Sequence, residues 1–149
     1  MNIWDKRYLD LAEFVASWSK DPSTKVGAVI VRPDKTIASV GFNGLPRGVE
    51  DSDERLHNRD LKYPMTVHAE VNAILHAQEP LHGYTIYVAP LNPCSDCAGV
   101  IIQSGIKRVV ARAEMNPRWL ESNALAQAMF EESGVISEFF DLAARPEEH

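Results

Sequence analysis

The feature that most constrains the fold is a pair of apolar β-type runs with a helical run between them. The two runs, "YTIYVA" (84–89) and "RVVARA" (108–113), are rich in residues that favour strands. Between them, Pro93 suits the first position of a helix that runs to Ser104, and Gly105 suits its end. Strand, helix and strand in succession form a right-handed parallel crossover, so the sequence predicts an α/β fold.

The remaining segments complete a layered architecture. Asn2 or Asp5 is expected to cap the first helix, and Pro22 to end it. Residues 43–64 are polar and are predicted to form a loop that is too long for a simple connector. The order of elements predicts a three-layer α/β/α fold with a mixed five-stranded sheet. The other predicted elements are strands at 26–31, 36–42 and 135–140 and helices at 4–15, 66–77 and 119–133.

Length and charge limit the classes of function. A chain of 149 residues suits one domain, predicted to span 1–149. Its formal net charge is −6, with 15 basic and 21 acidic residues, which disfavours a polynucleotide partner. No apolar run reaches the roughly 18 residues of a membrane span, and the N-terminus lacks a signal-peptide core. A cytoplasmic protein is expected, in the host cytoplasm if the chain is viral.

The segment "TVHAEVNAIL" (66–75) is predicted to begin a buried helix, yet its first turn carries two chemically active side chains. His68 is of a metal-ligand type, and Glu70 is of a general acid–base type. A buried helix behind them would hold both side chains rigidly. The apolar face of that helix is expected to consist of Val67, Val71, Ile74 and Leu75.

The two cysteines, Cys94 and Cys97, stand in "PCSDC" at the start of the next helix. So close a pair indicates a metal clip or a redox pair rather than a disulfide framework. Sulfurs at i and i+3 project to one side, and a helix N-terminus stabilises thiolates. The 22 residues between Glu70 and Pro93 suffice to finish a helix and cross one strand, so the two helix starts can meet. His68 and two thiolates would hold one Zn²⁺ and leave its fourth position open, as in catalytic sites.

Together these residues match the H-x-E…P-C-x-x-C signature of zinc nucleobase deaminases, as His68-Ala69-Glu70 and Pro93-Cys94-Ser95-Asp96-Cys97. The chain resembles the cytidine deaminase superfamily and, within it, the deoxycytidylate (dCMP) deaminases. Similar blocks, in that family's order, cover most of residues 19–110. Phe42 stands where the family more often has Tyr, no further cysteine offers a second metal site, and the resemblance fades after Ala113. The blocks are "SKDPSTKVGAVIV", "GFNGLPRGVED", "KYPMTVHAEVNAI", "TIYVAPLNPCSDC" and "IIQSGIKRVV".

The resemblance implies that dCMP and water give dUMP and ammonia. A water at the open zinc position would have its pKa lowered to about 7. Glu70 is expected to take a proton from that water, protonate N3 of the base and carry a second proton as ammonia leaves. The alternatives are a cytidine or tRNA-adenosine deaminase of the same superfamily, or a non-catalytic zinc module.

Five residues are candidates for binding the substrate. The resemblance implies that Asn43 binds the sugar 3′-hydroxyl and that the backbone N–H of Ala69 contacts the base; Asn43 could also be only a turn residue. Lys25 begins a strand near the expected site and is a candidate for the phosphate, although it could equally be solvated. Arg118 and Trp119 follow the fourth strand, where a loop could cover the base, although Trp119 could equally be core.

The loop "GFNGLPRGVED" has more glycine and proline than one contact with a sugar requires. In the resembled family this segment belongs to an allosteric nucleotide site, at which dCTP activates and dTTP inhibits a homohexamer. A triphosphate effector would bring Mg²⁺. The missing hydroxyl at Phe42 is expected to weaken either response, and the alternative is an ordinary surface loop. The residues assigned to this site are Gly41, Phe42, Asn43, Gly44, Pro46, Arg47 and Gly48.

Overall fold

One sheet contains five strands: β1 (Gly27–Val31), β2 (Ile37–Phe42), β3 (Thr85–Ala89), β4 (Arg108–Ala113) and β5 (Ile136–Asp141). The computed structural model describes residues 1–114 and 120–142. The strand order is β2-β1-β3-β4-β5. β1 pairs antiparallel with β2 and β3, whereas β3 with β4 and β4 with β5 are parallel. The predicted mixed sheet and its parallel crossover are confirmed.

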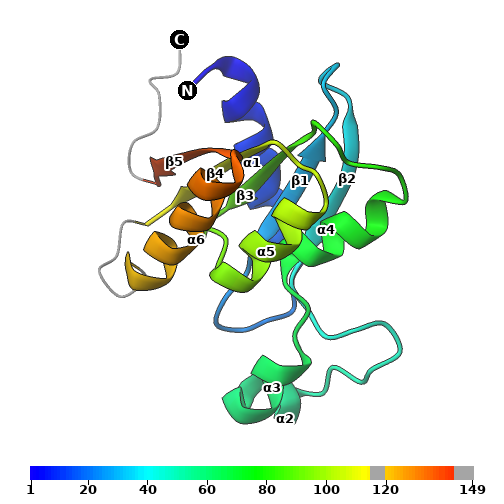
Figure 1. Ribbon diagram of the computed structural model, residues 1–149. Coiled ribbons are helices and arrows are strands. Elements are labelled where there is room, and N and C mark those ends of the chain that lie inside the picture. Colours follow the sequence, from blue (N-terminus) through cyan, green and yellow to red (C-terminus); the bar gives the residue numbers. More distant parts are fainter. Residues whose placement is uncertain (115–119, 143–149) are drawn as a thin grey trace.

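Helices cover both faces of this sheet (Figure 1). α1 (Ile3–Ala16) packs on one face, and α4 (Ala69–Ala77), α5 (Ser95–Gln103) and α6 (Leu120–Ser133) pack on the other. The strands alternate accordingly, since Tyr87 joins the core beneath α1 while Ile86 and Val88 join the opposite core. The three-layer α/β/α prediction is therefore confirmed. None of the helices in residues 1–114 and 120–142 combines the length and apolarity that a membrane crossing requires.

The first helix covers its predicted range but is not ended by Pro22. α1 stops at Ala16, where the backbone N–H of Ser17 bonds to carbonyls of the last turn, so the helix is closed well before Pro22. Asn2 is the N-cap, and its side-chain oxygen accepts a hydrogen bond from the N–H of Asp5 at 2.8 Å. The carboxylate of Asp5 is thereby left for other partners.

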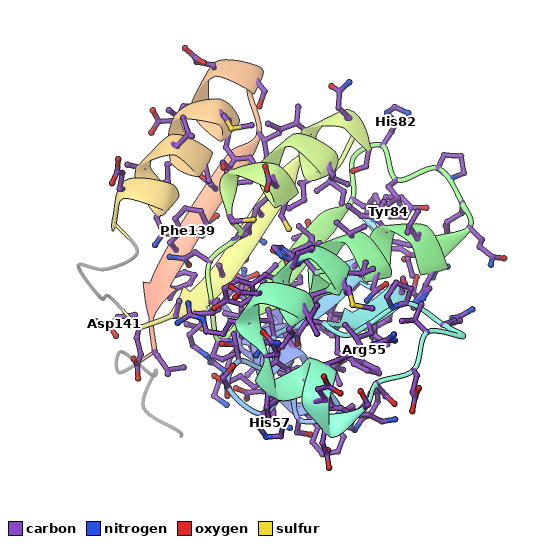
Figure 2. All side chains as sticks on the ribbon, turned by 90° about the horizontal axis from the view of Figure 1, so that it is seen from below. Arg55, His57, His82, Tyr84, Phe139 and Asp141 are labelled. Atoms are coloured by element: carbon purple, nitrogen blue, oxygen red, sulfur yellow. The ribbon has the colours of Figure 1, made fainter. Side chains whose placement is uncertain are left out.

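The segment 43–64, predicted to be a loop, runs through two short helices, α2 (Asp53–His57) and α3 (Arg59–Met65). Ser52 and Asn58 cap their N-termini with side-chain oxygens. We call residues 52–65 the insert. Figure 2 views the molecule from the end at which the insert lies, with Arg55 and His57 of α2 labelled. The polar composition of the insert concealed these helices, because short exposed helices carry little apolar periodicity.

α4 buries two alanines and a glutamate instead of the larger apolar side chains that were predicted. Its buried residues are Ala69, Glu70 and Ala73, whereas Leu75 is 65% exposed. Gly41 on β2 explains this difference, because a Cβ there would lie 2.4 Å from the backbone N of Ala73 and 2.6 Å from the carbonyl O of Ala69. The helix therefore lies closer to the sheet than a side chain at Gly41 would allow. The other three residues of the predicted apolar face are half-buried: Val67, Val71 and Ile74.

Two arginines of β4 tie this strand to α1. Arg108 donates to both carboxylate oxygens of Asp5, at 2.9 and 2.8 Å. Arg112 is fully buried and donates to Asp10 at 2.7 Å and to Glu13 at 3.1 Å. These ion pairs balance buried positive charge on the sheet with carboxylates from the helix, and the sequence pattern did not predict them.

Replacing Asp5 by Asn is expected to lower the free energy of unfolding by about 3 kcal/mol at neutral pH, because it breaks a buried ion pair. Burial alone raises the pKa of Asp5, but the hydrogen bonds and charge of Arg108, with the Tyr87 hydroxyl, hold it below the usual value. The stabilisation is therefore complete above the unfolded pKa of about 4 and is lost as the pH falls through the lower folded value.

Urea unfolding of the wild type and the Asp5→Asn variant, at neutral pH and at about pH 2 to 3, measures this effect. The control is Asp51→Asn, which removes an exposed pair with Lys20 and should change stability by less than about 1 kcal/mol. If the free energy of unfolding differed between the wild type and Asp5→Asn by the same amount at both pH values, a role for the ionised carboxylate would be contradicted.

Candidate functional site

Three metal-ligand side chains meet where two helices begin. His68 is the N-cap of α4 and Cys94 is the N-cap of α5, so Pro93 lies just before α5 instead of inside its first turn. The Nδ1 atom of His68 lies 3.1 Å from the Sγ of Cys97 and 3.6 Å from the Sγ of Cys94. Ligand atoms about 2.0 to 2.3 Å from a tetrahedral zinc lie roughly 3.5 Å from one another. The observed spacing therefore fits Zn²⁺.

The two thiols of this cluster differ in their protonation. A hydrogen bond with Cys97, aided by the His68 ring, lowers the pKa of Cys94 to about 4 even though burial opposes this. The same hydrogen bond and burial raise the pKa of Cys97. A proton on this pair is therefore held more strongly by Cys97 than by Cys94. A divalent cation displaces such a proton on binding, because thiolates are the metal-ligating form.

A cavity of about 490 Å³ opens beside the cluster. His68, Ala69, Glu70 and Cys94 line one part of it, and the first three of these stand at the start of α4. Glu70 is only 4% exposed, and burial raises the pKa of its carboxyl. Cavities of about 300 to 1,000 Å³ hold small-molecule ligands, so this one has room for a mononucleotide. A carboxyl group that can exchange a proton thus lies beside a metal-type cluster inside a ligand-sized cavity.

Two of the predicted substrate-binding residues line the cavity, Asn43 and Ala69. The side chain of Asn43 is held from behind: its Oδ1 accepts from the N–H of Val26 at 2.9 Å, and its Nδ2 donates to the carbonyl of Thr24 at 2.8 Å. Lys25 is not among the lining residues, and its Nζ donates to the carbonyl of Ser19 at 2.5 Å. Arg118 and Trp119 lie outside the described residues.

The cavity wall also contains residues that the sequence analysis missed. Arg59 and Tyr63 come from α3 of the insert, and the N-cap signals at Ser52 and Asn58 could have revealed that helix. Asn92 lies just before the cysteine motif, and its buried Oδ1 has no hydrogen-bond partner within residues 1–114 and 120–142. No local signal in the sequence singles out Asn92. The wall is completed by residues that include Asp21, Thr66, Leu91, Glu114 and Asn123.

The residues assigned to an allosteric site are divided between two environments. Phe42, Asn43 and Gly44 line a second cavity of about 240 Å³, together with residues that include Trp18 and Lys20. The other assigned residues, Gly41, Pro46, Arg47 and Gly48, do not line it. Gly41 packs under α4, the guanidinium of Arg47 lies 3.2 Å from the Nε2 of His76, and Gly48 adopts a left-handed conformation with φ +81°.

The chain matches known deaminases over most of its length. A model of the cytidine and deoxycytidylate deaminase zinc-binding region matches residues 2–113. An uncharacterized deaminase in the luxG 3′ region of Aliivibrio fischeri is 48% identical over 135 residues, which cover 89% of this chain and 90% of that protein. The deoxycytidylate deaminase of Homo sapiens is 38% identical over 138 residues, which cover 89% of this chain and 76% of that protein.

The fold also matches a solved structure. The dCMP deaminase of cyanophage S-TIM5, crystallised in complex with dCMP and dUMP, superposes with a TM-score of 0.73 at 27% identity. The match covers 94% of this chain and 99% of the phage chain. The family model includes both helix starts that carry the metal-type cluster. This chain belongs to the family of zinc-binding cytidine and deoxycytidylate deaminases.

Proposed function

We propose that this protein converts dCMP and water into dUMP and ammonia. The observation that carries the proposal is the buried Glu70 beside His68, Cys94 and Cys97 in a cavity of mononucleotide size. Relatives named deoxycytidylate deaminase, and a relative whose structure contains dCMP and dUMP, support this choice of substrate. The site of action would be the cytoplasm, or the host cytoplasm for a viral chain.

The residues divide the chemistry among them. A zinc ion held by His68, Cys94 and Cys97 would lower the pKa of a water to about 7, which makes water a nucleophile at neutral pH. The Glu70 carboxylate accepts a proton from the attacking water and donates it to N3 of the pyrimidine. It then takes the second proton from the hydroxyl now on C4 and passes it to the amino group, so that a C4 carbonyl forms and ammonia leaves.

Residues along the cavity wall orient the substrate. The backbone N–H of Ala69, at the first turn of α4, contacts the base. Asn43 has one amide hydrogen bonded to the Thr24 carbonyl, which leaves the second for the sugar 3′-hydroxyl. The N–H of Ala69 is fixed by α4, and the amide of Asn43 is fixed by its hydrogen bonds to the backbone. These two groups therefore bind the nucleoside in one orientation with little loss of conformational entropy. Arg118 and Trp119 stay predicted substrate contacts, whereas Lys25 does not line the cavity and is not part of this proposal.

The substrate assignment is tested by ammonia release from dCMP, CMP, deoxycytidine and a tRNA anticodon stem. We expect dCMP to be deaminated with the highest kcat/KM, because the relatives in Pongo abelii and Homo sapiens are named deoxycytidylate deaminases. The net charge of −6 disfavours the tRNA substrate. A higher kcat/KM for deoxycytidine or for the tRNA stem would replace this proposal, and no turnover of any of them would favour a non-catalytic zinc module.

Glu70→Gln is expected to keep the zinc ion and the fold. Its kcat should fall by a factor of about 10² to 10⁴ or more, because Gln cannot carry the proton. Cys97→Ala is the contrasting variant, and it should lose zinc and lower the melting temperature, because a metal ligand contributes to folding. Elemental analysis, thermal unfolding and dCMP turnover are measured on both. A loss below tenfold in zinc-loaded Glu70→Gln would show that the proton travels by another route, and full zinc occupancy in Cys97→Ala would remove it from the ligand set.

We further propose allosteric control by dCTP as activator and dTTP as inhibitor, with Mg²⁺ accompanying the triphosphates. The second cavity supports this idea, because it shares Asp21, Asn43 and Thr66 with the first cavity. A ligand in one cavity therefore touches residues of the other. Effectors shift activity only when they bind one state of the protein more tightly.

A homohexamer is the assembly that we propose for this control. Exposed aromatic side chains support association of copies: Phe14 is 61% exposed, Trp18 49% and Phe42 38%. Their rings contact one another edge to face, with centroids 5.7 Å apart for Phe14 and Trp18 and 6.2 Å apart for Trp18 and Phe42. A contiguous exposed aromatic cluster is typical of an interaction surface.

In kinetics against dCMP concentration, dCTP with Mg²⁺ is expected to lower the concentration needed for half-maximal rate, and dTTP to raise it. Light scattering on the same samples measures the assembly. Hyperbolic curves that neither triphosphate shifts would leave an enzyme without this regulation. A monomeric mass under all conditions would contradict the hexamer.

A further inference from the structure

The sequence-based candidate for binding the substrate phosphate, Lys25, does not line the cavity. A phosphate needs a cationic partner, and the cavity wall also contains the acidic side chains of Glu70 and Glu114, which do not favour an anion. Apart from His68 of the metal cluster, Arg59 is the one cationic side chain among the lining residues that the structure describes. Among the described residues, Arg59 is therefore the side chain best suited by its charge to bind a phosphate in this cavity.

The guanidinium of Arg59 is positioned by an aromatic ring and has no polar partner among the residues that the structure describes. It lies over the ring of Tyr63, 5.0 Å from its centroid, and both residues belong to α3 and line the cavity. Within residues 1–114 and 120–142, no side chain forms an ion pair or hydrogen bond with it. The contact with the Tyr63 ring uses none of the N–H donors of the guanidinium, so these donors are available to a ligand. Such a fork is suited to bidentate binding of a phosphate.

The helix that carries Arg59 is anchored to the body of the protein. Lys62, also on α3, is buried, and its Nζ donates to Asp21 at 3.1 Å and to the Ser23 hydroxyl at 2.8 Å. This pair fixes α3 against the segment before β1 and compensates the charge of Asp21. The ammonium of Lys62 is thereby occupied, and that of Lys25 donates to the Ser19 carbonyl. Neither lysine competes with Arg59 for a ligand in the cavity.

We propose that Arg59 binds the 5′-phosphate of dCMP and gives the enzyme its preference for the nucleotide over the nucleoside. This inference rests on the proposed function. The base then lies beside Glu70 and the metal cluster on α4 and α5, and the phosphate lies against α3 of the insert. The insert is thus the element that distinguishes a nucleotide from a nucleoside.

The test compares kcat/KM for dCMP and deoxycytidine in the zinc-loaded wild type, Arg59→Ala and Arg59→Lys. Arg59→Ala should lower kcat/KM for dCMP roughly tenfold to a hundredfold, the range for a charge-assisted hydrogen bond, and leave deoxycytidine unchanged. Arg59→Lys keeps the positive charge but cannot form two parallel hydrogen bonds, so its kcat/KM for dCMP should lie between those of the wild type and Arg59→Ala. Inhibition by dUMP should weaken in the same order, whereas inhibition by deoxyuridine should not change.

Arg7→Ala is the matched control, because Arg7 stacks over Trp4 at 4.8 Å and does not line the cavity. This variant should leave kcat/KM unchanged for both dCMP and deoxycytidine. An unaltered preference for dCMP in Arg59→Ala overturns the inference while the proposed function stands. A parallel loss for dCMP and deoxycytidine, with a lowered melting temperature, also overturns it and makes Arg59 a structural residue. A wild type that does not deaminate dCMP overturns the proposed function itself.

Discussion

The close approach of α4 to β2 is the constraint on which the site depends. At Gly41 the helix backbone occupies the space in which a Cβ would lie, so the position of α4 is set by backbone contact. His68 and Glu70 stand at the start of this helix and are placed by it. The parallel crossover from β3 through α5 to β4 brings Cys94 and Cys97 to the same end of the sheet. Neither helix holds the whole ligand set, so the cluster exists only when both elements have packed.

Much of this arrangement could be predicted because it is encoded locally. The strands follow runs of β-branched residues, and α5 ends near the predicted position at Gly105, which adopts φ +88°. The metal-type cluster could be inferred because its three residues have a recognisable spacing. The buried face of α4 was predicted wrongly, since large apolar residues were expected to face the sheet. The short distance to β2 selects Ala69 and Ala73 instead.

Other features could not be predicted because they join residues that are distant in sequence. The ion pair of Lys62 with Asp21 spans 41 positions, and no periodicity encodes it. The same holds for Arg59, whose place in the cavity wall follows from the anchoring of α3. The nucleotide site predicted over residues 41–48 stays a prediction, and it includes residues in two different environments. Gly41 allows close packing, while Phe42 lines the second cavity.

The ion pairs between α1 and β4 also determine when the protein can finish folding. Asp5 and Arg108 are separated by 103 positions, and Glu13 and Arg112 by 99. During synthesis α1 is made long before β4, so its carboxylates stay hydrated until the arginines exist. Contacts of such long range also slow the search for the native state. The ion pairs that fasten α1 to the sheet therefore cannot form before β4 has been made, although α1 also packs on the earlier strands β1 and β3.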